Sequence, residues 1–281
     1  MNYREHQPSP VLAKYLECFW FVSDAGIATT NGVAERVLPD GCVEWIFHLG
    51  TPFCRWLNGC WALQPCSFVV GELTRFILLQ PSGPVATMGV RFRPGGAYRF
   101  LPVPLDLLTD EAVSTSNIWG REGRFLEEAV IDAANDLERQ RLIEKFLAAR
   151  LLNASSRPQF EAAVSVIMQT RGQTRVAELA AGVGWSARQL EREFRARAGL
   201  SPKVLARIIR FQRLLQLVGE APLRQWASLA LEGGYSDQPH MVREFREFAG
   251  QSPGENQAAL TSSLVRNLVS PRRLAALLGT P

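Results

Sequence analysis

The carboxyl-terminal part of this chain contains one helix-turn-helix pattern twice, at an offset of about fifty residues. Residues 180–186, with the sequence AAGVGWS, align with residues 230–236, with the sequence ALEGGYS. Each stretch is followed by two apolar residues four apart, a glycine and a Ser-Pro dipeptide: Leu190, Phe194, Gly199 and Ser201-Pro202 in the first copy, and Met241, Phe245, Gly250 and Ser252-Pro253 in the second. Similarity at so many positions predicts a repeated unit of two helices and a tight turn.

Capping chemistry predicts where the helices of both copies begin and end. Ser186 and Gln189 form a capping-box pattern, so the second helix of the first copy begins there. In the second copy a Gly-Gly pair ends one helix, and Ser236 or Asp237 caps the next. A helix over residues 202–218 separates the copies, and at 1.5 Å per residue it is roughly 25 Å long. Its predicted inward positions are Leu205, Ile208, Ile209 and Leu215.

The second helix of each copy carries polar side chains away from its apolar stripe. In the first copy these are Arg188, Arg192 and Arg195, and in the second they are Gln238, His240 and Arg243. Such side chains hydrogen-bond base edges and phosphates, so the repeated pattern favours DNA recognition over a merely solvated helix face. Two recognition helices on one chain enter successive major grooves only if they lie about 34 Å apart.

From about Phe160 to Glu255 the chain resembles the DNA-binding domain of the AraC/XylS family of bacterial transcription regulators. The match is fullest in the second copy, at Gly234-Tyr235-Ser236-Asp237-Gln238, His240, Arg243, Phe245, Gly250 and Ser252-Pro253. The resemblance implies seven helices, two recognition helices, and binding to double-stranded promoter DNA beside RNA polymerase, as an activator or a repressor. It assigns base contacts to Arg188, Glu191 and Arg192 in the first recognition helix, and to Gln238, Pro239 and Arg243 in the second. Pro239 departs from the polar residue that the family frequently has there.

Residues 11–96 have the pattern of a β-rich domain. Short runs rich in Val, Ile, Phe and Trp alternate with turn-forming residues, which predicts a β-sandwich or small barrel. The predicted strands are Leu16–Val22, Cys42–Leu49, Ser67–Val70, Phe76–Leu79 and Val85–Phe92. Residues 38–42 (LPDGC) and 89–96 (GVRFRPGG) resemble the cupin-like sensor domains attached to AraC-type regulators. A barrel of this size can hold one small ligand, so we expect an effector site in it.

The predicted fold is α+β, with a β-rich cupin-like barrel and flanking helices, followed by an all-α domain with the two motifs joined by a long helix. The predicted domains are residues 1–153, helical over about 105–152, then residues 157–258 for DNA binding, and a tail at 259–281. Residues 153–158 are small and polar and form the predicted linker. The amphipathic helix Leu137–Leu152 either packs on its own barrel or forms the interface of a homodimer.

Four residues in or directly after the predicted strands are candidates for effector binding: Glu44, His48, Arg91 and Arg93. Glu44 and His48 share one face of a strand, as do Arg91 and Arg93 of another. The arginines bind an acidic effector if their face lines the barrel. Otherwise they are surface charges or partners in a structural ion pair, because an unpaired buried arginine is costly. Metal-binding cupins use clustered histidines, and His48 stands alone in this region, so we expect no metal and no other cofactor.

The five cysteines all lie in the first quarter of the chain. Cys54, Cys60 and Cys66 recur every six residues, whereas zinc sites usually bring two ligands within two to four residues of each other. Reduced thiols are the default in a cytoplasmic protein of this size. The alternative to a small-molecule effector is a thiol-based sensor or alkyl acceptor at these cysteines, with DNA binding as its output.

Charge divides the chain into two parts. Residues 155–281 carry 17 Lys and Arg against 10 Asp and Glu, whereas residues 1–154 carry 14 against 17. A basic carboxyl-terminal part fits a polyanionic partner. No apolar run approaches the roughly 20 residues that cross a membrane, and the first ten residues lack the pattern of a secretion signal, so we expect a cytoplasmic protein. The sequence signatures of hydrolase elbows, phosphate loops, zinc proteases and dinucleotide binding are absent, which argues against an enzyme.

Overall fold

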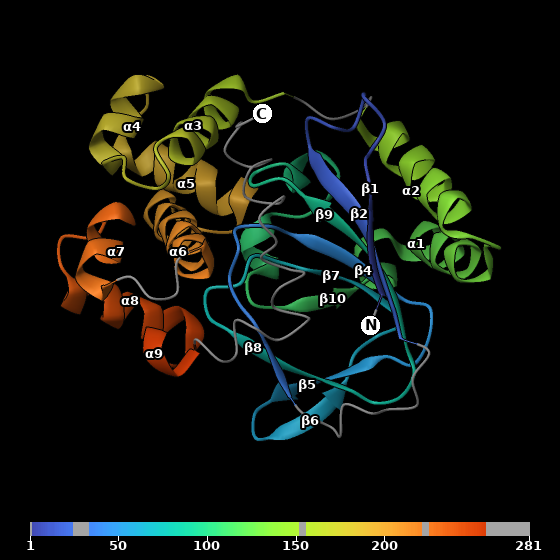
Figure 1. The fold of residues 1–281 in the computed structure, drawn as a ribbon. Helices are drawn as coiled ribbons and strands as arrows, with labels where there is room; N and C mark the ends of the chain where they lie inside the picture. Colours follow the sequence, from blue (N-terminus) through green and yellow to red (C-terminus); the bar gives the residue numbers. More distant parts are fainter. Residues whose placement is uncertain (1, 25–33, 152–155, 221–224, 257–281) are drawn as a thin grey trace.

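The computed structural model describes residues 2–24, 34–151, 156–220 and 225–256. It has a β-rich amino-terminal part and a helical carboxyl-terminal part, which confirms the predicted α+β class. Figure 1 shows the two parts side by side, with the helical part packed against one end of the strands. Part of the predicted linker and the predicted tail at 259–281 lie outside the described residues.

One sheet has six antiparallel strands in the order β1-β2-β9-β4-β7-β10. Their bounds are β1 (Asn2–His6), β2 (Leu16–Asp24), β4 (Glu44–His48), β7 (Ser67–Val70), β9 (Val85–Phe92) and β10 (Ala112–Ser114). Strand β9 lies at the centre and pairs Trp20 with Gly89 on one side and Glu44 with Arg91 on the other. The predicted strands at 67–70 and 85–92 match the structure, whereas β1 and β10 have no counterpart among the predicted strands.

The second sheet has four strands in the order β3-β8-β5-β6. Their bounds are β3 (Glu35–Val37), β8 (Ile77–Pro81), β5 (Phe53–Leu57) and β6 (Cys60–Leu63). A two-residue turn joins β5 to β6, and both of its residues, Asn58 and Gly59, have positive φ angles, of 49° and 88°. This is the backbone geometry that favours an Asn-Gly hairpin.

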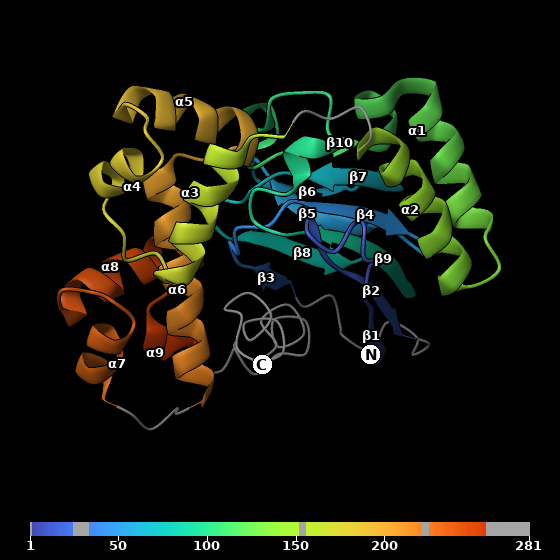
Figure 2. The ribbon, with the colours of Figure 1, turned by 90° about the horizontal axis from the view of Figure 1, so that it is seen from above.

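Side chains of the six-stranded sheet alternate between two environments. On β4, Trp45 and Phe47 point into a core shared with helices α1 (Thr115–Asp132) and α2 (Asp136–Leu151), while Glu44 and His48 point the other way. The two helices cover the outer face of the sheet, and the four-stranded sheet faces its inner side (Figure 2). The structure thus places the predicted helix at 137–152 on its own barrel. Helix α1 lies within the region predicted to be helical, at about 105–152, and Ser114 caps its first turn.

The carboxyl-terminal part confirms the doubled motif. Its described residues form seven helices, the number that the family resemblance implies. They are α3 (Pro158–Gln169), α4 (Val176–Gly182), α5 (Ala187–Ala198), α6 (Pro202–Glu220), α7 (Trp226–Glu232), α8 (Gln238–Ala249) and α9 (Pro253–Asn256). Short 3₁₀ helices η1 (Ala97–Arg99) and η2 (Leu105–Leu108) lie between β9 and β10 in the chain and contact α5.

The two turns are alike in their backbone hydrogen bonds. Trp185 N donates to Ala180 O at 2.9 Å, and fifty residues later Tyr235 N donates to Ala230 O at the same distance. Gly184 and Gly234 occupy the equivalent positions with φ angles of 69° and 81°. Both recognition helices, α5 and α8, are 12 residues long and end at a left-handed glycine. The repeat in the sequence is therefore a repeat of structure.

Gly184 and Gly182 provide a matched pair for testing the turn. A Cβ at either position meets no atom within 4 Å, but only Gly184 has a positive φ angle. We expect Gly184→Ala to lower the free energy of unfolding by about 1–2 kcal/mol through backbone strain alone. We expect Gly182→Ala, in a helix, to leave it unchanged or slightly raised. Urea unfolding of the two variants checks this, and equal losses would contradict the strained turn.

Candidate functional site

Helix α5 presents a basic face to solvent. Its N-cap Ser186 accepts a hydrogen bond from Gln189 N at 3.2 Å, as the capping-box pattern predicts. Leu190 and Phe194 are fully buried, which turns Arg188 and Arg192 outward on the opposite side. Arg195 is also exposed, and its Nε bonds the carboxylate of the half-buried Glu191 at 3.0 Å. The four predicted DNA-contacting residues of this helix therefore lie together along its exposed side.

Helix α8 presents a shorter polar face. Asp237 is its N-cap and accepts a hydrogen bond from His240 N at 2.7 Å. Gln238, Pro239 and Arg243 are exposed. His240 is half-buried, with its Nδ1 3.1 Å from Ser236 Oγ, so its ring is already engaged in the turn. Proline in the first turn of the helix lacks the N–H that would otherwise be unpaired there, which explains why the helix tolerates it.

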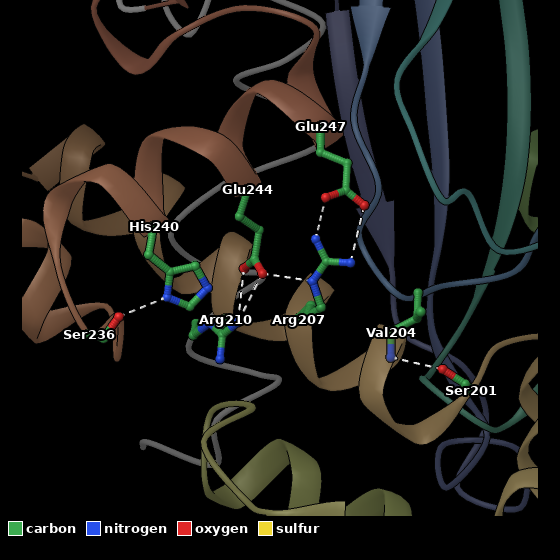
Figure 3. A network of polar contacts seen from close by, with 8 residues as sticks. All are labelled: Ser201, Val204, Arg207, Arg210, Ser236, His240, Glu244 and Glu247. Carbon is green, nitrogen blue, oxygen red and sulfur yellow. Dashed lines mark hydrogen bonds and ion pairs between the residues drawn. The ribbon is translucent and has the colours of Figure 1, made fainter.

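A buried carboxylate fixes α8 against α6. Glu244 is only 3% exposed and bonds both Arg207 Nε at 2.7 Å and Arg210 Nη2 at 2.9 Å (Figure 3). Glu247, on the next turn of α8, extends the network to the other nitrogens of Arg207. Burial alone lowers the pKa of Arg207, but its bonds to Glu247 and Glu244 raise it, so the guanidinium stays charged. The recognition helix is thereby held in one orientation on α6.

The amino-terminal domain borders the exposed face of α5. Thr109 Oγ1 donates to Gly199 O at 2.6 Å, where α5 ends. Residues Pro104, Asp106 and Leu107 form one wall of an open groove whose other wall includes Arg188, Arg192 and Arg195. A change in the position of the η2 segment would therefore change the surroundings of the first recognition helix directly.

A cavity of about 110 Å³ lies between the two sheets. Its walls are mostly apolar and aromatic, with polar side chains at a few positions. The six-stranded sheet contributes Trp20, Glu44, Ile46, His48, Phe68 and Thr87, and the four-stranded sheet contributes Phe53, Arg55, Ile77 and Leu79. A concave, largely apolar site with a few polar groups is the usual form of a small-molecule site.

The four predicted effector residues lie in different surroundings in the structure. Glu44 and His48 line the cavity, as their shared face predicts. Arg91 is fully buried and forms an ion pair with Glu44. This is the predicted alternative of a structural ion pair, and not direct effector binding. Arg93 lies one residue beyond the end of β9 and donates to Ala13 O at 2.9 Å, so the expectation that it shares a strand face with Arg91 is wrong. It is not among the residues that line the cavity.

His48 is neutral in the cavity wall. Burial lowers its pKa to about 4, which a hydrogen bond with Gln64 only partly offsets. Its two ring nitrogens lie 3.3 Å from Thr87 Oγ1 and from Gln64 Oε1. Because both nitrogens have protein partners, the ring contributes an apolar, aromatic surface to the cavity.

Helix α6 closes one side of the cavity. Gln212 of α6 lines it, and Gln212 Nε2 donates to Pro39 O at 2.6 Å. Gly41, in the same turn, lies so close to α6 that a Cβ there would be 3.2 Å from Ile209 and 3.3 Å from Leu205. The interior of the barrel is therefore in direct contact with the helix that joins the two motifs. Gln212 could not be predicted as a cavity residue from the sequence, since only the folded chain brings residues 39 and 212 together.

The three spaced cysteines do not converge. Cys54 is half-buried on β5, while Cys60 and Cys66 are exposed. Cys60 pairs with Leu57, three residues from Cys54, so the two thiols point to opposite faces of the hairpin. Among the described residues there is no cluster of three or more histidine, cysteine or acidic side chains suited to a metal ion. No helix within the described ranges is long and apolar enough to span a bilayer.

Two helix-turn-helix units with exposed basic faces, joined by one buried helix, define a DNA-binding transcription regulator. Residues 179–259 match a family model described as a helix-turn-helix domain. Residues 4–114 match a family described as a domain of unknown function (DUF6597). Over residues 179–259 the match agrees with the resemblance to the AraC/XylS family that the sequence motifs carry.

Solved structures of ToxT from Vibrio cholerae are similar to the chain over most of its length. One has 10% sequence identity and a TM-score of 0.49, covering 93% of this chain and 100% of that chain. Another, of ToxT bound to (E)-4-(8-methylnaphthalen-1-yl)but-3-enoic acid, has 10% identity and a TM-score of 0.48, with the same coverage. No curated protein matches the chain in sequence.

Glu244 and Glu247 allow a test of the contact between α6 and α8. Glu244→Gln leaves two arginines without their buried counter-charge, so we expect a loss of about 3 kcal/mol in the free energy of unfolding. Glu247→Gln is the control, because Glu247 is 57% exposed and its pair with Arg207 is worth less than about 1 kcal/mol. Denaturant unfolding measures both. Similar losses for the two variants would show that Glu244 does not hold the helices together.

Proposed function

We propose that one copy of this chain recognises an asymmetric promoter site by placing α5 and α8 in successive major grooves on one face of the duplex. The observation that carries the proposal is the doubled motif on a single buried helix. Because both motifs pack on α6 within one core, their separation is set by the chain and not by a dimer interface. A second copy of the chain is then unnecessary for binding two adjacent turns of DNA. RNA polymerase is the expected protein partner at a promoter.

The proposed base contacts differ between the two helices. Arg188 and Arg192 of α5 are exposed and suited to guanine or phosphate contacts, with Glu191 and Arg195 beside them. In α8 the exposed Gln238 and Arg243 carry the hydrogen-bonding capacity, since Pro239 has no side-chain donor. His240 is a phosphate contact rather than a base contact in this proposal, because it is half-buried in the turn.

We further propose that a small effector occupies the cavity in the barrel and changes DNA binding through α6. Gln212 links the cavity wall to α6, and the turn that contains Gly41 packs on the same helix. A ligand that favours one arrangement of these contacts shifts the population of DNA-binding states. In this proposal the protein is a cytoplasmic regulator and not an enzyme.

Substitution of the recognition arginines tests the DNA contacts. We expect Arg192→Ala and Arg243→Ala each to weaken binding to the specific site by about 1–3 kcal/mol, with a smaller effect on random DNA. Arg175→Ala is the control. Arg175 precedes α4, outside both recognition helices, and its side chain is 85% exposed. Fluorescence anisotropy at fixed moderate salt measures all three.

The DNA site itself provides the decisive comparison. If one rigid chain spans two grooves, inserting five or ten base pairs between the half-sites removes the contact of one helix and weakens binding in both cases. Binding that recovers fully with ten inserted base pairs would indicate independently placed helices. Equal affinity for the protein's own upstream region and for random DNA would overturn the proposed function.

A further inference from the structure

The cavity contains a buried hydrogen-bond donor without an acceptor. Trp20 lines the cavity and is 7% exposed, and its indole Nε1 has no hydrogen-bond partner in the described part of the chain. A buried N–H usually has a partner, because an unpaired one costs about 1–3 kcal/mol. An acceptor supplied by a ligand would satisfy it.

The indole of Trp20 is held in place by the sheet beneath it. Trp20 pairs with Gly89 across β2 and β9, and a Cβ on Gly89 would lie only 2.0 Å from the indole ring. The ring therefore lies directly over the glycine, where any other residue would displace it. This close contact fixes the orientation of the donor before any ligand arrives, which lowers the entropy cost of binding.

A second buried donor comes from the opposite sheet. Arg55 lines the cavity from β5 and is 8% exposed. Its Nη2 donates to Asp110 O at 2.8 Å, whereas its Nε has no hydrogen-bond partner among the described residues. Burial lowers the pKa of Arg55, and the nearby carboxylates of Glu111 and Asp110 act in the opposite direction. The guanidinium of Arg55 thus has carboxylates near it. Its Nε–H is the group that Arg55 can donate to a ligand.

Aromatic rings form another part of the cavity wall. The ring of His48 lies 5.6 Å from Phe53 and 5.7 Å from Phe68, centre to centre, and all three residues line the cavity. Such spacing is typical of packed aromatic groups, which favour a flat aromatic guest. An apolar cavity of about 150 Å³ can hold benzene, so the volume here, about 110 Å³, limits the ligand to no more than a single ring.

The charged groups of the wall do not call for a charged ligand. Glu44 forms an ion pair with Arg91, and Arg36 lies over the ring of Phe76 at 5.2 Å. Glu35 and Asp40 are engaged in interactions of their own. An ionic ligand would also have to lose its hydration on entering a largely apolar cavity, which is unfavourable.

We propose that the cavity binds an uncharged, single-ring aromatic molecule that carries a carbonyl or similar hydrogen-bond acceptor, with the acceptor bonded to Trp20 Nε1. Arg55 Nε is a second donor for the same acceptor group. This ligand class rests on the proposed role of the cavity as the effector site. It specifies what the effector must contain: a flat apolar ring, one acceptor, and no net charge.

Four one-ring probes of similar size test the ligand class: acetophenone, ethylbenzene, benzoate and benzylamine. Binding to the full-length protein is measured by isothermal titration calorimetry. We expect acetophenone to bind about three- to tenfold more tightly than ethylbenzene, the fold-change of one neutral hydrogen bond. Benzoate and benzylamine should bind more weakly than acetophenone. Tighter binding of either ion, or equal binding of acetophenone and ethylbenzene, would overturn the ligand class.

Trp20→Phe keeps an aromatic side chain and removes the N–H donor. In this variant acetophenone should lose its advantage over ethylbenzene, whereas in the control Trp61→Phe, outside the cavity on β6, the advantage should persist. Far-UV circular dichroism checks that each variant folds. If Trp20→Phe does not fold, the comparison of the four probes in the unaltered protein still tests the ligand class. An advantage that persists in folded Trp20→Phe would overturn the assigned hydrogen bond.

A DNA-binding assay with saturating probe separates the ligand class from the effector role. If acetophenone binds but does not change the affinity for the specific DNA site, the ligand class holds and the effector role fails. If an ionic probe binds best and does change DNA affinity, the effector role holds and the ligand class fails. If none of the four probes binds, the ligand class fails.

Discussion

The burial of helix α6 is the constraint on which the rest of the structure depends. Leu205, Ile208 and Leu214 are fully buried in the core of the carboxyl-terminal part, which includes residues of both helix-turn-helix motifs. The same helix contacts the barrel through Gln212 and through the turn at Gly41. A helix packed on so many sides cannot shift relative to one neighbour without disturbing the others, because protein interiors are close-packed.

This arrangement joins the two tasks that we propose for the chain, DNA recognition and effector sensing, which lie in different places. The recognition helices need a fixed separation to meet successive grooves, and the ion pairs of Glu244 with Arg207 and Arg210 help to provide it. The cavity needs a route by which its occupancy is sensed, and Gln212 lies on that route. Contacts of η2 beside α5 add a second route from the amino-terminal domain to the DNA-facing surface. The proposed regulation therefore needs only small changes at surfaces already in contact.

The carboxyl-terminal part could be predicted closely because its signals are local. Caps at Ser186 and Asp237 and the left-handed glycines act within a few residues, and the repeat confirms each of them. In the barrel, the Asn58-Gly59 turn is also a local signal and could have revealed β5 and β6. The cavity could not be predicted in the same way. The donors of Trp20 and Arg55, and the approach of Gln212, arise from contacts between segments far apart in sequence, which periodicity does not encode.

The distance between the two motifs, measured with and without DNA, tests most directly whether they form one rigid frame. Nitroxide labels at Ala181 and Leu231, equivalent exposed positions in α4 and α7, report it by double electron–electron resonance once Cys54, Cys60 and Cys66 are replaced by serine. A frame fixed by α6 predicts one narrow distance distribution that changes by less than about 2 Å when the specific DNA is bound. A broad distribution without DNA, or a shift of several ångströms on binding, would contradict the fixed arrangement of the recognition helices.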